Sequence, residues 1–214
     1  MFLFFIFALA YDMVIATRSV IIIAMIVFLI SVFSYIIMEN KIKNKLRILI
    51  IIFASILVII AMYSTDTFEI KTKIESSNLF SRIEDRENMT SDNARINAQL
   101  DAIKNILKYP FGMPKDISFA GLSYAHNMWL DVAKETGIIP LILLIVFFIL
   151  NICSLIKVVK DKKWPVKLKI LLISVYITFL LIFSIEPILQ GIPIIFIAFC
   201  ILASFIDAIS KEYN

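Results

Sequence analysis

Long apolar runs alternate with short polar breaks along most of the chain, and one long polar segment interrupts the pattern. The apolar runs cover about residues 1–16, 20–38, 48–63, 138–156, 170–185 and 192–206. A helix rises 1.5 Å per residue, so the longer runs can cross a bilayer, and their continuity favours helices over the alternating strands of a barrel. The pattern predicts an all-α integral membrane protein with about six transmembrane helices.

Composition supports the same class of protein. The chain has 61% hydrophobic and 18% charged residues, whereas a soluble domain is roughly 45–50% apolar with about a quarter of its residues charged. The first run resembles a signal peptide, because residues 8–10 mimic a cleavage site. No Lys or Arg precedes it, however, and the next apolar run follows almost at once. We therefore expect residues 1–16 to form a short or truncated membrane helix.

The basic residues predict which parts of the chain lie outside the cytoplasm. Short loops rich in Lys and Arg remain in the cytoplasm, and two such loops occur at residues 39–47 and 157–169. Two spans separate these loops, so both can lie on the cytoplasmic side. The polar segment 64–137 and the turn 186–193 then lie outside, as does Arg18 at the outer end of the second helix. The net charge of +4 accordingly reports topology and not binding to nucleic acid.

Three parts follow from this topology: membrane helices in residues 1–63, a large extracytoplasmic loop in 64–137, and membrane helices in 138–214. The spacing of apolar residues predicts an amphipathic helix in the loop, capped by Ser91 or Asp92 and ended by Pro110 and Gly112. Its apolar face, expected on the lipid or on the helix bundle, comprises Ile96, Leu100, Ile103, Ile106 and Leu107.

A second short amphipathic helix is predicted from about Ala125 to Thr136, with Gly137 as its C-cap. His126, the only histidine in the chain, falls in its first turn. A helix N-terminus disfavours a protonated imidazole, so His126 is expected to be neutral and able to accept a proton. The alternative is a histidine with a purely structural role.

Other candidate residues also have two interpretations. Arg18 lies between apolar runs, where a guanidinium must pair, reach the interface or face a water-filled cavity. Arg95 can bind substrate or pair with Asp92 on its own helix. Glu186 can line a site or lie in the interface. Tyr124 and Trp129 suit interfacial anchors or surfaces on which sugars stack.

Metal-binding patterns are lacking in the outer segment of the sequence. It contains no Asp-x-Asp motif and no cluster of His and carboxylate residues with metal-ligand spacing. We expect no metal and no cofactor.

The order of the polar motifs resembles a known family. An arginine begins the second helix, and another arginine leads the outer amphipathic helix. Pro-Phe-Gly follows at residues 110–112, Ala-His-Asn-x-Trp-Leu at 125–130 and Glu-Thr-Gly-Ile-Ile-Pro at 135–140. This pattern is similar to that of the O-antigen ligase and O-antigen polymerase superfamily of bacterial membrane glycosyltransferases. The family's small glycine-rich turn after the proline is reduced here to one glycine.

Family members are longer and have more spans, so the chain is expected to correspond to the C-terminal half of a bundle like that of GT-C glycosyltransferases. The resemblance implies transfer of glycan from an undecaprenyl-diphosphate-linked donor to an acceptor hydroxyl, on a glycan or a lipid A core, in synthesis of O-antigen or capsule. It places the protein in the bacterial inner membrane with an extracytoplasmic active site. Membrane lipids and other polysaccharide assembly proteins are the further partners, and no nucleic acid is expected.

The resemblance also implies roles for particular residues. Arg18 and Arg95 would bind the diphosphate, and His126 would take the proton of the acceptor hydroxyl or orient that hydroxyl. The residues Asn127, Tyr124 and Glu186 would bind substrate. Two other classes of protein remain open: a flippase for lipid-linked oligosaccharide, and a non-catalytic truncated membrane protein.

Overall fold

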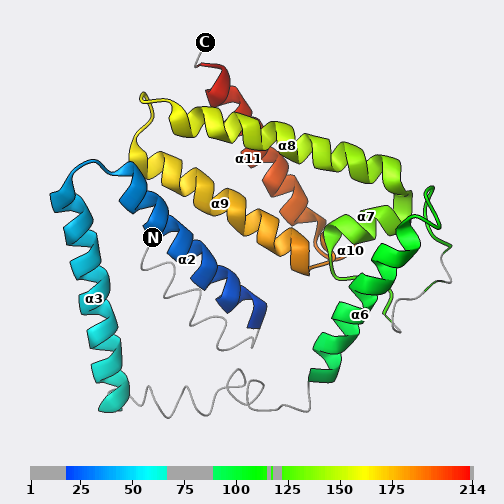
Figure 1. The fold of residues 1–214 in the computed structure, drawn as a ribbon, viewed down its shortest axis with the longest axis horizontal. Coiled ribbons are helices and arrows are strands. Elements are labelled where there is room, and N and C mark those ends of the chain that lie inside the picture. Colours follow the sequence, from blue (N-terminus) through cyan, green and yellow to red (C-terminus); the bar gives the residue numbers. More distant parts are fainter. Residues whose placement is uncertain (1–17, 67–88, 115–116, 118–121, 213–214) are drawn as a thin grey trace. The chain divides into compact units, whose positions relative to one another are not determined.

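The structure, a computed structural model, describes residues 18–66, 89–114, 117 and 122–212. The regular elements in these residues are helices (Figure 1), which confirms the all-α class. The helix predicted at residues 1–16 lies outside the described part. The chain forms two compact units, Met1–Asn88 and Met89–Asn214.

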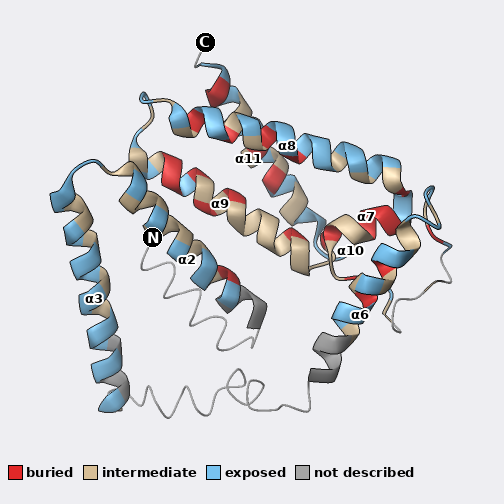
Figure 2. Cartoon of the chain, viewed as in Figure 1, coloured by how far each residue is buried: buried red, intermediate tan, exposed pale blue. Residues whose placement is uncertain are grey.

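The first unit contains helices α2 (Arg18–Met38) and α3 (Ile42–Ser64). Helix α2 coincides with the second predicted span and begins two residues earlier, so Arg18 is its first residue. The side chains of α3 are exposed along most of its length (Figure 2). An exposed face of this kind is typical of a helix that contacts lipid or another helix.

The basic loop predicted at residues 39–47 is largely helical, because α3 begins at Ile42 and not near Ile48. Lys, Leu and Arg have high helix propensity, so the apolar helix extends back through them. The connection shrinks to residues 39–41, where a carboxylate oxygen of Glu39 accepts the backbone N–H of Lys41 at 2.9 Å. Three of the four basic residues of this loop, Lys43, Lys45 and Arg47, therefore lie on the first two turns of α3, and Lys41 precedes the helix.

The second unit contains α6 (Met89–Ile106), α7 (Met128–Thr136), α8 (Ile138–Lys160), α9 (Val166–Ile185), α10 (Ile188–Gly191) and α11 (Pro193–Lys211). In the described residues, three helices are long and apolar enough to cross a membrane, namely α8, α9 and α11. They coincide with the last three predicted spans, and the protein is a membrane protein. The total of six spans stays a prediction. The apolar stretch described in α2, Ile22–Met38, is shorter than each of these three helices.

Aromatic rings fill the core between α8, α9 and α11. Phe148 and Phe199 stack with their ring centroids 4.5 Å apart, and Phe183 meets both rings edge-on. Hydrogen bonds join the same helices: the Tyr176 hydroxyl donates to the Phe148 carbonyl at 3.2 Å. Between membrane helices, close packing and such hydrogen bonds drive association. The three helices thus form a bundle with one shared core.

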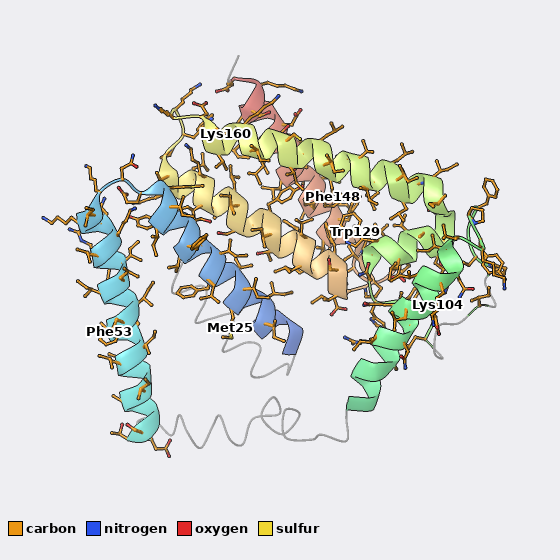
Figure 3. The ribbon with its side chains drawn as sticks, in the orientation of Figure 1. Met25, Phe53, Lys104, Trp129, Phe148 and Lys160 are labelled. Atoms are coloured by element: carbon orange, nitrogen blue, oxygen red, sulfur yellow. The ribbon has the colours of Figure 1, made fainter. Side chains whose placement is uncertain are left out.

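Helix α7 belongs to this core although it lies outside the predicted spans. Met128 is fully buried, and Val132 packs in the same cluster. The ring of Trp129 lies 4.7 Å from that of Phe148 (Figure 3). Trp129 is half-buried, and its indole packs on α8; its interfacial or sugar-stacking role stays a prediction. The bundle directly supports the helix that follows His126.

Helix α6 packs on α7 mainly through small residues, and Ile106 is the one residue of its predicted apolar face that packs beside them. Ala98 and Ala102 are fully buried and cluster with Ala125 and Met113. Alanine allows two backbones to approach closely, so these residues form the contact. Four residues of the predicted apolar face are instead exposed, namely Ile96, Leu100, Ile103 and Leu107. Within the described part of residues 89–214, these four side chains therefore do not pack on the helix bundle. Their contact with lipid stays a prediction.

The ends of α6 also differ from the prediction. The helix begins at Met89, so Ser91 and Asp92 lie within its first turn and do not cap it. It ends at Ile106, before Pro110, and the N–H groups of Lys108 and Tyr109 both donate to the Asn105 carbonyl at 3.0 Å. These turn-like bonds satisfy the Asn105 carbonyl in the last turn without a capping glycine.

Candidate functional site

Helix α7 begins after Asn127, which is its N-cap. The Asn127 Oδ1 accepts the backbone N–H of Trp129 at 3.1 Å and of Leu130 at 3.3 Å. Asparagine is among the best N-cap residues because its side chain satisfies such free N–H groups. His126 therefore precedes the helix, and its predicted place in the first turn is wrong. The helix-terminus argument for its protonation state no longer applies.

His126 has an unusual backbone, with φ at 51°. Only a few per cent of non-glycine residues adopt this left-handed region, in which histidine is several-fold enriched. The conformation costs about 1–2 kcal/mol, so the surroundings must hold it in place. The ring Nδ1 of His126 is buried and has no hydrogen-bond partner in the described part of the chain.

Asp131 holds the backbone on both sides of His126. One carboxylate oxygen accepts the N–H of Ala125 at 2.7 Å, and the other accepts the N–H of Asn127 at 3.3 Å. The side chain of Asp131 is buried, at 1% exposure. Burial raises the pKa of this carboxyl, and the two N–H groups and the neighbouring His126 and Lys134 partly offset that rise.

Sequence reasoning missed Asp131, although a signal existed. In a capping box, an acidic residue three positions after the N-cap accepts the N-cap's own backbone N–H. Asp131 lies four positions after Asn127 and makes the same contact. The pattern becomes visible only when the N-cap is placed at Asn127, and the predicted start at Ala125 concealed it.

Lys134 connects the loop before His126 to the same helix. It is buried, and its Nζ donates to the Ser123 carbonyl at 2.5 Å. The ammonium lies 6.0 Å from the centre of the Tyr124 ring, within the range of a cation–π contact. Residues Ser123 to Asn127 are thus fixed to α7 by two charged side chains.

Asn127 also connects this loop to the membrane bundle. Its Nδ2 donates to the Ser184 carbonyl in α9 at 3.0 Å, and Glu186, the C-cap of α9, follows two residues later. The structure therefore brings four predicted site residues, Tyr124, His126, Asn127 and Glu186, to one end of the bundle. The amide of Asn127 has a structural role there that the sequence did not indicate.

The two contacts of Asn127 can be separated by mutation. Asn127→Ser keeps an N-cap but is too short to reach Ser184, so it should destabilise the folded protein by about 1 kcal/mol. Asn127→Ala loses both contacts and should cost about 2 kcal/mol. Unfolding in detergent, followed by circular dichroism, measures both. Wild-type stability of Asn127→Ser would show that the contact with α9 contributes nothing.

The Pro-Phe-Gly segment packs against the C-terminus of α7. The Pro110 carbonyl accepts the N–H of Ile138 at 2.9 Å, and the Met113 N–H donates to the Lys134 carbonyl at 2.8 Å. Gly137 has φ at 90°, and a Cβ built there would lie 2.4 Å from the Pro110 oxygen. Only glycine permits this approach. The three motifs of the outer segment consequently form one hydrogen-bonded body.

Arg95 belongs to the same compact unit as this body, whereas Arg18 belongs to the other unit. Arg95 is exposed on α6. At 3.6 residues per turn, positions 95, 98 and 102 share one helix face, so Arg95 continues the face whose alanines pack beside Ala125. Arg18 begins α2 in that other unit, and its place in a site shared with His126 stays a prediction.

Among the described residues, no three His, Cys, Asp or Glu side chains gather closely enough to hold a metal ion. The polar groups around α7 are one imidazole and the buried Asp131 and Lys134, and Arg95 offers an exposed guanidinium on α6. Such a set can bind anionic oxygens and orient a hydroxyl.

Comparison with known proteins gives one match. A family model described as O-antigen ligase matches residues 3–145, which include Arg18, Arg95, His126, Asn127 and Gly137. No curated protein and no solved structure matches the chain.

Proposed function

The chain belongs to the O-antigen ligase family, and on that premise we propose that it transfers glycan from an undecaprenyl-diphosphate carrier to an acceptor hydroxyl. One observation carries the proposal. Three short motifs, at residues 110–112, 126–127 and 135–137, meet around α7: the last two lie at its two ends, and the first is bonded to its C-terminal end through Pro110 and Met113. Asn127 in turn bonds this body to the Ser184 carbonyl of α9. A set of polar motifs held rigidly on an apolar bundle suits chemistry at a membrane surface.

The arginines suit the leaving group of this reaction. A departing diphosphate gains negative charge in the transition state, and a guanidinium binds phosphate oxygens through two parallel hydrogen bonds. Arg95 is exposed, and it lies on the α6 face that packs beside Ala125. We assign it to the diphosphate, and we assign Arg18 to the same group in the assembled protein.

His126 orients the acceptor hydroxyl in this proposal. A histidine that accepts a proton at Nε2 carries its own proton on Nδ1, and a partner for that N–H fixes the tautomer. Nδ1 of His126 is buried without a partner in the described residues, which favours the orienting role over the general base. Tyr124 and Glu186, at the same end of the bundle, bind sugar hydroxyls or rings.

The site faces away from the cytoplasm of a bacterial inner membrane in this proposal. Helix α8 begins at Ile138, beside the site, and ends at Lys160 in the Lys-rich loop (Figure 1). Its 23 residues span about 35 Å at 1.5 Å each, which is about the thickness of the hydrocarbon core. The positive-inside rule assigns the lysines to the cytoplasm and hence the site to the opposite face.

Reconstitution of the chain in vesicles with an undecaprenyl-diphosphate-linked glycan tests the proposal. Two acceptors are supplied in parallel, a second lipid-linked glycan and a lipid A core, and products are separated by gel. Longer glycans indicate a polymerase and modified lipid A core a ligase. Movement of the donor across the bilayer without transfer would identify a flippase. A non-catalytic protein would give neither product nor movement.

A further inference from the structure

The most buried charged side chain beside the candidate site is that of Asp131, and the proposed reaction does not yet use it. It is 1% exposed. Its two oxygens accept the N–H groups of Ala125 and Asn127, at 2.7 and 3.3 Å. These are the residues immediately before and after His126. One carboxylate thus holds the backbone at both ends of the histidine.

Helix capping alone does not explain this arrangement. Asn127 already satisfies the N–H groups of Trp129 and Leu130 at the start of α7. The bond from Asp131 to Ala125 reaches two residues beyond the N-cap, to a position outside the helix. Burying a carboxylate is costly unless hydrogen bonds compensate for the lost water. The short bond to Ala125 provides such compensation and fixes a loop residue.

The backbone of His126 is what this carboxylate holds. Its φ of 51° lies in a region that persists in non-glycine residues only when the surroundings enforce it. Hydrogen bonds to a charged acceptor are stronger than those between neutral groups, and the carboxylate makes one on each side of this residue. The two bonds are therefore placed to hold the histidine in this conformation.

We infer that Asp131 is the positioning residue for His126: its carboxylate binds the N–H on either side and so fixes the direction in which the imidazole points. This inference rests on the proposed function, in which His126 orients the acceptor hydroxyl. A displacement of about 1 Å in such a group can lower the rate about 100-fold. Asp131 touches no substrate and acts only through the backbone.

Asp131→Asn tests the inference with little change in shape. The amide presents an NH₂ group to one of the two N–H donors, so one of the two bonds is lost. We expect kcat for glycan transfer to fall on the order of 10–100-fold with little change in KM, because the effect concerns orientation and not substrate binding. The matched control is Asp101→Asn, a partly exposed aspartate on α6, which should behave like the wild type.

A direct readout separates positioning from general stability. His126 is the only histidine in the chain, so isotope-labelled histidine gives one imidazole in NMR spectra of protein purified through a tag without histidine. In Asp131→Asn the imidazole signal should shift and broaden, and in Asp101→Asn it should not change. An unchanged signal in Asp131→Asn would overturn the inference, and so would a changed signal with wild-type kcat.

A measurement on the wild type covers the case in which Asp131→Asn fails to fold. The amides of Ala125 and Asn127 should exchange their hydrogens slowly with solvent, because both are bound to the buried carboxylate. Exchange of either amide hydrogen as fast as in an unfolded chain would contradict the inference. Failure of the proposed function is recognised separately, since a wild-type chain that transfers no glycan would still give the NMR and exchange results.

Discussion

Replacing His126 by alanine is expected to lower the rate of glycan transfer by about 10²–10⁴-fold, the usual contribution of a group that positions or moves a proton. The variant should fold, because the imidazole Nδ1 makes no hydrogen bond in the described residues. Its melting temperature in detergent should therefore stay near that of the wild type. Wild-type transfer by His126→Ala would remove this residue from the mechanism.

His126→Gln distinguishes the two roles of the histidine. The glutamine amide places an N–H donor near the position of Nε2 but accepts no proton at neutral pH. If His126 orients the hydroxyl, this variant should retain activity within about 10-fold of the wild type. If His126→Gln is as inactive as His126→Ala, His126 acts as a base. The N–H at its buried Nδ1 must then find a hydrogen-bond acceptor in the complex with substrate.

Arg95 has a matched control on its own helix. Arg95→Ala should reduce transfer, and Arg95→Lys should restore little, because an ammonium lacks the planar fork that binds two phosphate oxygens. Lys104 is exposed on the opposite face of α6, nine residues along, and its side chain is 74% exposed. Lys104→Ala should leave transfer unchanged. Equal losses in both alanine variants would indicate a general effect of charge and not a diphosphate site.

Gly137→Ala is expected to destabilise the protein by about 2–6 kcal/mol, the largest effect on folding that we predict. The backbone of Gly137, with φ 90° and ψ −174°, lies in a region that is essentially confined to glycine and costs other residues about 1–3 kcal/mol. The added methyl would also lie 2.4 Å from the Pro110 oxygen and 2.8 Å from the Phe111 carbonyl carbon, an overlap worth about 1–3 kcal/mol. The yield of folded protein in detergent and its melting temperature should both fall.

Other glycines of the chain provide the controls. A methyl at Gly191 would meet only the Pro187 Cγ, at 3.7 Å, so Gly191→Ala should change stability by less than about 1 kcal/mol. Gly112 has φ at 106° and its methyl would lie 3.2 Å from the Glu135 oxygen, so Gly112→Ala should fall between the two. Similar melting temperatures for Gly137→Ala and Gly191→Ala would show that the motifs are not packed as described.

Periodic apolar runs made the membrane helices predictable, and the positions of α8, α9 and α11 follow from them. Local competition between cap residues was harder to predict. The prediction starts α7 at about Ala125, whereas the side-chain oxygen of Asn127 sets its start at Met128 by satisfying two N–H groups. Moving the start by three residues removed His126 from the helix and revealed Asp131.

Tertiary contacts account for the other differences. The repeat of large apolar residues on α6 is visible in the sequence, yet the helix packs through Ala98 and Ala102, because the approach distance to α7 selects small residues. Trp129 is a residue type typical of membrane interfaces, and only the tertiary structure shows that its ring packs against Phe148 at the edge of the core. Neither contact is encoded in the spacing along the chain. Arg18 stays a predicted site residue, since it belongs to the other unit.

The bond between the Ile138 N–H and the Pro110 carbonyl has a consequence for chimeric proteins. Gly137 marks the boundary between outer segment and membrane helix in the sequence, and it is the obvious point at which to exchange outer segments between family members. In the folded protein this boundary is the junction where the Pro-Phe-Gly segment, α7 and α8 meet. A graft that carries its own α8 and α9 keeps the contacts of Pro110 and Asn127 intact. A graft cut at Gly137 divides them between two parents.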